Sequence, residues 1–151
     1  MLKKIFAPAN DSFCTSFGLL VLRLSFGLTM LLAHGLDKVK GFSKLSSGFP
    51  DPLHVGRPVS LSLSIFAELI CSALLAVGLV TRFSAFVCAI NMGVAFFVVL
   101  KGAFGESHNG ELAFLYLAGY VVLLMAGPGK LSMDKAVFGG SKGARQESSK
   151  G

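Results

Sequence analysis

Long apolar runs alternate with short polar connections along this chain. The apolar runs cover approximately residues 15–36, 59–80, 83–100 and 111–127. Crossing the hydrocarbon layer of a membrane takes about 20 predominantly apolar residues, with a range of about 17–25, so each run is long enough. Because backbone polar groups in lipid must form hydrogen bonds within their own segment, the pattern predicts four membrane-spanning helices.

The connections between these runs differ in length and chemistry. Residues 37–58 contain three of the five prolines, and the step "FPDP" excludes a regular helix there. The second and third runs are separated by little more than Thr81 and Arg82, so these helices should form an antiparallel hairpin. The predicted fold class is therefore all-α, an integral membrane antiparallel four-helix bundle.

The bundle is expected to occupy residues 15–138. A short N-terminal segment, residues 1–14, precedes it and is expected on the cytoplasmic side. The glycine-rich polar tail, residues 139–151, is expected to be disordered or to be in part an added tag.

The distribution of lysine and arginine predicts the orientation, because these residues concentrate on the cytoplasmic side of membrane helices. With the N-terminus inside, the inner side holds eight such residues, namely Lys3, Lys4, Arg82 and five in the C-terminal region. The outer side holds five: Lys38, Lys40, Lys44, Arg57 and Lys101. This difference favours a multi-pass protein of the bacterial inner membrane with both termini in the cytoplasm.

Polar residues interrupt the first run in a regular pattern. At 3.6 residues per turn, Arg23, His34 and Lys38 fall on one helix face, which should point to the bundle interior. A charged side chain at the bilayer centre costs at least about 2.5–3.5 kcal/mol, so Arg23 should have a partner. Glu68 lies at a similar depth in the second run, and an Arg23–Glu68 ion pair is therefore predicted.

Each of the other runs adds polar groups to the same interior. Glu68 shares its helix face with Ser64 and Ser72, and the third run contributes Asn91. His108 and Glu111 stand at the start of the fourth run. The convergence predicts a pocket between the outer end and the midplane, walled by His34, Lys38, Glu68, Asn91, His108 and Glu111. Serine and asparagine also serve as plain interhelical contacts in membranes, and Lys38 could instead extend its amine to the interface.

Composition narrows the class of protein further. The chain is 53% hydrophobic with a mean hydropathy of +0.70, and 15% of its 151 residues are charged, against about 25% in soluble proteins. The net charge of +6 therefore indicates loops near anionic lipid rather than a nucleic-acid partner. Three widely spaced cysteines form no metal-ligand or disulfide motif, so no metal site is expected.

Three stretches of the sequence together resemble the DoxX family of small four-helix membrane proteins. They are "RLSFGLTMLLAHGLDKVKGF", "AELICSALLAVGLVTRFSA" and "GPGKLSMD". The matching residues of the first stretch are Arg23, Gly27, His34, Gly35 and Lys38; those of the second are Glu68, Gly78 and Arg82. The third stretch contributes Gly127, Gly129, Lys130, Ser132 and Asp134. The resemblance extends from about residue 18 to Asp134.

This resemblance implies redox work linked to quinone, either in the oxidation of reduced sulfur compounds or in defence against oxidative stress. The chain would then be a subunit of a membrane oxidoreductase with a protein partner. Glu68 and His34 would be the catalytic residues. The quinone would be bound by His34, Lys38, Asn91, His108 and Glu111. No flavin, nicotinamide or iron–sulfur motif is present, so the electrons would come from outside the chain.

Two other functions stay open. A non-catalytic membrane scaffold or small-solute carrier needs only a packed bundle with a hydrated pocket. A b-type haem held between His34 and His108 is a further hypothesis, because two histidines on facing helices are a necessary feature of such a site. Whether the chain is an enzyme is left undecided by the sequence.

Overall fold

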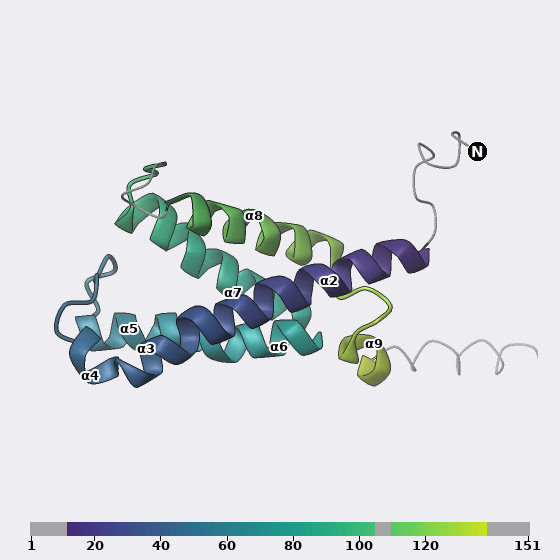
Figure 1. The fold of residues 1–151 in the computed structure, drawn as a ribbon, viewed down its shortest axis with the longest axis horizontal. Helices are drawn as coiled ribbons and strands as arrows, with labels where there is room; N and C mark the ends of the chain where they lie inside the picture. The colour runs from purple at the N-terminus through teal and green to yellow at the C-terminus, as the bar shows by residue number, and fades with distance from the viewer. Residues whose placement is uncertain (1–11, 105–109, 139–151) are drawn as a thin grey trace, which may run out of the picture.

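The computed structural model describes residues 12–104 and 110–138, and these residues form helices and loops without any strand. Three helices are long and apolar enough to cross a membrane: Phe13–Lys40, Arg57–Val77 and Thr81–Val99. A shorter apolar helix follows at Gly110–Ala126. Figure 1 shows these four long helices packed along a common direction. The chain is an all-helical membrane protein.

A π-helical turn lies within each of the first two helices and forms the end of the third. The first helix consists of α2 (Ser12–Met30), η1 (Leu31–Gly35) and α3 (Leu36–Lys40). The second consists of α5 (Arg57–Ile65), η2 (Phe66–Cys71) and α6 (Ser72–Val77), and the third of α7 (Thr81–Gly93) and η3 (Val94–Val99). The remaining elements are α4 (Phe42–Leu45), α8 (Gly110–Ala126) and α9 (Met133–Phe138).

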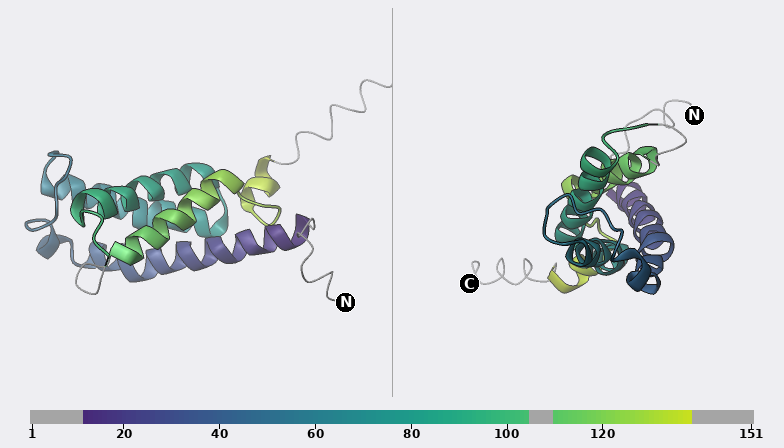
Figure 2. Two further views of the ribbon diagram at one scale, coloured as in Figure 1. Left: turned by 90° about the horizontal axis from the view of Figure 1, so that it is seen from above. Right: turned by 90° about the vertical axis from the view of Figure 1, so that its left-hand side faces the viewer.

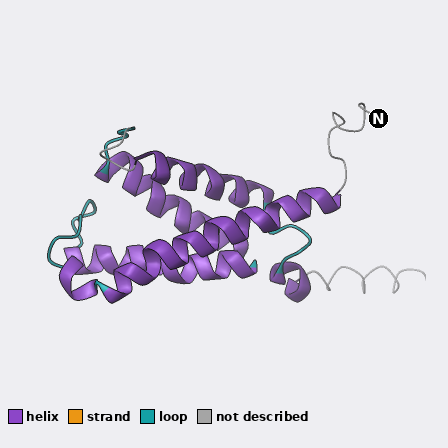
Figure 3. Cartoon of the chain, in the orientation of Figure 1, coloured by secondary structure: helices purple, strands orange, loops and turns teal. Residues whose placement is uncertain are grey.

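The first helix is longer than its apolar run. It continues past residue 36 to Lys40, so Lys38 lies within the helix that the predicted face of Arg23, His34 and Lys38 requires. The strongest packing joins α7 to α8 and α2 to α6. Figures 1 and 2 show the two ends that result. The loop end carries α4 and the connection 46–56, and the termini end carries the start of α2, the α6–α7 turn and α9 (Figure 3).

Two glycines let the first helix approach the second very closely. A Cβ atom added at Gly27 would lie 2.8 Å from the backbone oxygen of Ser72, and one at Gly35 would lie 2.7 Å from that of Glu68. Small residues at such contacts are how membrane helices bring their backbones together. The contacts also set the antiparallel register, in which Gly35 faces Glu68 and Gly27 faces Ser72.

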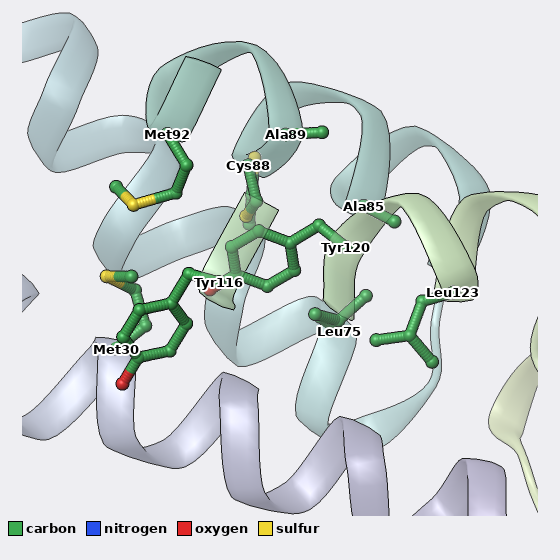
Figure 4. Close-up of a cluster of buried hydrophobic side chains, with 10 residues drawn as sticks. Met30, Leu75, Ala85, Cys88, Ala89, Met92, Tyr116, Tyr120 and Leu123 are labelled. Carbon is green, nitrogen blue, oxygen red and sulfur yellow. The ribbon is translucent and has the colours of Figure 1, made fainter. Parts of the chain in front are cut away.

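The centre of the protein is a cluster of buried side chains from all four long helices. Met30, Leu75 and Cys88 are each at most 2% exposed. The rings of Tyr116 and Tyr120, which are one helical turn apart, stack with centroids 5.9 Å apart. Figure 4 shows the two tyrosines lying among these residues. Cysteines 71 and 88 are both buried free thiols.

The turn between α6 and α7 is held by α9 from a distance in the sequence. Gly78 adopts a left-handed conformation with φ of 74°, and the amide of Leu79 donates to the carbonyl of Leu74 at 2.9 Å. The Asp134 carboxylate then accepts hydrogen bonds from the amides of Val80 at 2.6 Å and Thr81 at 2.9 Å. Partial burial raises the pKa of Asp134, but the hydrogen bonds from Thr81 and Val80, together with the positive charge of Arg23, outweigh it, and the pKa lies below its ordinary value.

Replacing Gly27 by alanine should destabilise the protein, because the added methyl group has no room against Ser72 and Ala76. Overpacking of this kind costs about 1–3 kcal/mol. The measurement is thermal unfolding in detergent. Gly18→Ala is the matched control on the same helix, since no atom lies within 4 Å of a Cβ atom there. Equal midpoints for the two variants would contradict the close approach.

Candidate functional site

A buried ion pair joins the first two membrane helices. Glu68 lies in η2 and is 3% exposed. The Lys38 ammonium group donates to both of its carboxylate oxygens. One of these oxygens, Oε1, also accepts from the Ser64 hydroxyl at 2.9 Å and from the Asn91 amide at 3.0 Å. Three helices therefore meet at one carboxylate.

All three π-helical turns lie beside this carboxylate. His34 belongs to η1, Glu68 to η2, and η3 begins three residues after Asn91. A π-helical turn widens the helix and shifts the side chains that follow it, and such turns occur frequently at functional sites. In this protein, the turns around Gly35 and Glu68 are also where the two helix backbones come into contact. His34 and Glu68 thus lie where the helices depart from regular geometry, and Lys38, Ser64 and Asn91 lie in the adjoining α-helical segments.

Two cavities share the ion pair as part of their walls. The first, the loop cavity, has a volume of about 260 Å³ and is lined by Lys38, Ser60, Ser64, Glu68 and Asn91 together with apolar residues. The second, the inner cavity, has a volume of about 180 Å³ and is lined by His34, Lys38, Glu68, Tyr116 and apolar residues that include Met30 and Met92. Glu68 and Lys38 are therefore accessible from two sides.

The connection 46–56 covers the loop cavity. Phe49, Pro50, Pro52 and Leu53 line that cavity, and the Phe49 ring lies 5.8 Å from the Lys38 nitrogen. Asp51 holds the connection in shape. Its carboxylate accepts from the Ser60 hydroxyl at 2.6 Å and from the amides of Gly56 at 2.8 Å and Val55 at 3.1 Å.

These contacts explain the electrostatics of Asp51. The hydrogen bond from Ser60 lowers the pKa of Asp51 below its ordinary value, and the two backbone amides act in the same direction. The hydrogen bonds depend on the ionised carboxylate. They persist above the ordinary carboxyl pKa and are lost as the pH falls through the lowered one.

The histidine of the first helix faces the inner cavity and an aromatic neighbour. The His34 ring meets Tyr116 edge to face, with centroids 6.2 Å apart. Glu111 is exposed at the start of α8 and lines none of the cavities found among the described residues. His108 lies outside the described residues. The predicted haem site between His34 and His108 therefore stays a prediction.

The predicted Arg23–Glu68 ion pair is wrong. Glu68 binds Lys38, whereas the Arg23 guanidinium is fully buried at the termini end and donates to the carbonyl of Leu131. The error was one of register. Because Gly27 faces Ser72 and Ala76, Arg23 reaches Gly78, ten residues further along the second helix than Glu68.

Sequence reasoning also missed two contributors to the site. Tyr116 was not among the predicted site residues, and its contact with His34 depends on how α8 packs against the first helix. Asp51 was passed over, although it stands between two prolines and ahead of Gly56, a pattern typical of a structured turn. That pattern is the one signal that could have identified it.

Comparison with known proteins gives the family. A family model described as DoxX matches residues 18–101, which is more than half of the 151 residues. The chain belongs to the DoxX family. This family model includes Arg23, His34, Lys38, Glu68 and Asn91 within its bounds.

Several DoxX-type relatives cover most of the chain. An uncharacterized protein of Haemophilus influenzae is 32% identical over 114 residues, which are 72% of this chain and 83% of the relative. A Bacillus subtilis protein named "Putative oxidoreductase CatD" is 33% identical over 135 residues, covering 88% of this chain and 95% of the relative. An uncharacterized membrane protein of Mycobacterium tuberculosis is 28% identical over 135 residues, which cover 76% of this chain and 77% of the relative. No solved structure matches this chain.

The ion pair makes a specific prediction about energetic coupling. In a double-mutant cycle, Lys38→Met and Glu68→Gln should be non-additive, with an interaction energy of about 0.5–3 kcal/mol, because each substitution removes the partner of the other. Unfolding in detergent measures the four stabilities. Arg23→Met combined with Glu68→Gln is the matched control. The two effects should add within about 0.5 kcal/mol, since the residues share no contact. Coupling in the second cycle and none in the first would contradict the observed pairing.

Proposed function

We propose that this DoxX protein is a quinone-binding subunit of a membrane oxidoreductase, linked to the oxidation of sulfur compounds or to oxidative-stress defence. The observation that carries the proposal is the position of the Lys38–Glu68 pair. It forms part of the wall of two cavities, one beneath the connection 46–56 and one beside His34 and Tyr116. A proton-transferring carboxylate needs such access from both sides. The Bacillus subtilis relative named as an oxidoreductase supports the same class of activity.

The inner cavity suits the head group of a quinone. An apolar cavity of about 150 Å³ in another protein takes up benzene, so a volume of about 180 Å³ admits a single substituted ring. Met30, Met92 and Leu112 supply apolar contacts, and His34 and Tyr116 supply polar groups. When bound, a quinone would accept two electrons and two protons.

The residues of the two cavities would divide the work. His34 would donate a hydrogen bond to a quinone carbonyl oxygen, and Glu68 would hold and deliver a proton at its carboxylate. Lys38 would pair with Glu68 between transfers and attract an anionic reductant, such as a sulfur oxyanion, towards the loop cavity. The electrons would enter from that reductant or from a partner protein in the membrane.

One feature favours the alternative function, a non-catalytic scaffold or small-solute carrier. Oxygen Oε1 of Glu68 accepts hydrogen bonds from Lys38, Ser64 and Asn91 at once. A carboxylate satisfied in this way can serve as a purely structural connection between helices. Binding experiments separate the two functions.

We also propose that four helices, α8 included, cross the bacterial inner membrane with both termini in the cytoplasm. The basic residues support this orientation, since eight of them fall on the predicted inner side and five on the outer.

Ser43 lies on the exposed surface of α4 at the loop end. A cysteine placed there should react with an impermeant maleimide added outside intact spheroplasts. Arg82→Cys is the control at the termini end, because Arg82 is exposed there whereas Thr81 is buried. The cysteine of this variant should stay unlabelled. The opposite pattern would invert the topology.

The functional proposal predicts weaker quinone binding when the inner cavity is altered. His34→Ala should lower the affinity for a quinone analogue by about three- to tenfold, as expected for one hydrogen bond of about 0.5–1.5 kcal/mol. Glu68→Gln should also weaken binding. Equilibrium binding to the purified protein in detergent is the measurement.

Each of these two variants has a matched control: Glu111→Gln for Glu68→Gln, and His54→Ala for His34→Ala. Glu111→Gln removes a carboxylate that lines none of the described cavities, and His54→Ala removes an exposed histidine of the connection. Both should bind the analogue like the wild type. If His34→Ala and Glu68→Gln also bind normally, or if the wild type does not bind, the scaffold or carrier function is the better one.

A further inference from the structure

A groove lies on the outer surface between α2 and α8. It has a volume of about 220 Å³ and is lined by Ser25, Phe26, Thr29, Leu112, Leu115 and Tyr116. Leu115 is 60% exposed and Leu112 is 43% exposed, so the groove opens to the surroundings of the protein. It lies near the middle of the long helix Phe13–Lys40, at the level where the surroundings of a membrane helix are lipid chains.

The lining of this groove is largely apolar, although Ser25, Thr29 and Tyr116 each carry a hydroxyl group. The Thr29 hydroxyl donates to the backbone carbonyl of Ser25 at 2.6 Å. The Tyr116 hydroxyl forms a hydrogen bond with the Thr29 side chain, so these two hydroxyl groups are paired within the protein. Phe26 closes the groove towards the termini end, because its ring packs where a Cβ atom on Gly119 would lie. The groove therefore suits an alkyl or isoprenoid chain rather than a polar ligand.

The groove and the inner cavity are neighbours that share a wall. Leu112 and Tyr116 line both of them. Three aromatic rings lie in a row from the groove to the inner cavity. The ring centroids of Phe26 and Tyr116 are 5.2 Å apart, and those of Tyr116 and His34 are 6.2 Å apart. Figure 4 shows the Tyr116 ring close to Met30, which also lines the inner cavity.

We propose that this groove is a lateral entrance from the lipid bilayer into the inner cavity, with Tyr116 and Leu112 as its gate. The occupant is the lipophilic tail of a membrane-borne ligand whose polar head group lies beside His34 and Glu68. The identity of that head group as a quinone rests on the proposed function. The entrance itself rests on the shared wall and on the apolar lining.

Thr29→Trp should block the entrance, since Thr29 is exposed and lines the groove. Leu28→Trp is the matched control, because Leu28 is 42% exposed on the same helix and lines none of the described cavities. A membrane-partitioning aryl diazirine is photolysed with the protein in liposomes. Mass spectrometry then measures labelling of Met30 and Met92, which are 2% and 7% exposed.

The wild type and Leu28→Trp should be labelled at these two methionines, and Thr29→Trp should lose at least nine-tenths of that labelling. Absence of labelling in the wild type, or equal labelling in Thr29→Trp, overturns the entrance.

Ligand binding tests the tail directly. Thr29→Trp should weaken the binding of a quinone with a long isoprenoid tail at least tenfold relative to Leu28→Trp. A tail-less quinone added from the aqueous phase should be weakened much less, because the loop cavity reaches the same Lys38–Glu68 pair from the other side. Equal effects on both quinones, or no effect on either, contradict the placement of the tail. If neither quinone binds the wild type, the proposed quinone function fails, and the diazirine labelling alone decides whether the entrance exists.

Discussion

The ionised carboxylate of Glu68 is the constraint on which the arrangement of this protein depends. A charge within a membrane helix is costly unless it is paired, and Glu68 is almost completely buried. Lys38 can pair with it because the first helix continues to Lys40, one turn beyond its apolar run. Gly35 allows the two backbones to touch beside the pair, and the π-helical turns η1 and η2 meet at the same place. Charge neutralisation, close packing and irregular helix geometry therefore occur together, at the place where the first two helices meet.

The other buried charge of the first helix has a different role. Arg23 lies at the termini end, where it donates to the carbonyl of Leu131, while Asp134 from the same segment accepts from the first amides of α7. The segment between Gly127 and Asp134 is thereby tied to two helices. None of the cavities found among the described residues is lined by this segment. The protein thus has a structural end, built around Arg23, and a site end, built around Glu68.

Membership of the DoxX family indicates the fold of this protein more than it indicates the chemistry at the site end. The fold follows from helix length, small residues and paired charges, which relatives about 30% identical can share. Function depends on what enters the cavities beside Glu68, and only one of the relatives described here carries the name of an activity. The site has features that a membrane redox protein needs: a buried carboxylate with an ammonium partner, a histidine, and an apolar cavity large enough for one ring.

The sequence by itself determined the helical class, the membrane environment and the family, because hydrophobic runs of sufficient length have few alternatives in lipid. It also identified Arg23, His34, Lys38, Glu68 and Asn91 as the unusual polar residues, since such groups are rare in apolar helices. What it could not determine was which of them meet. Regular 3.6-residue geometry placed Arg23 and Lys38 on one stripe but said nothing of the register between helices. That register is set by the contacts of Gly27 and Gly35 with the neighbouring backbone. It also depends on the π-helical turns, which no local sequence pattern predicts. Only the tertiary structure decided that Lys38 is the partner of Glu68, because pairing depends on how far one helix slides along another.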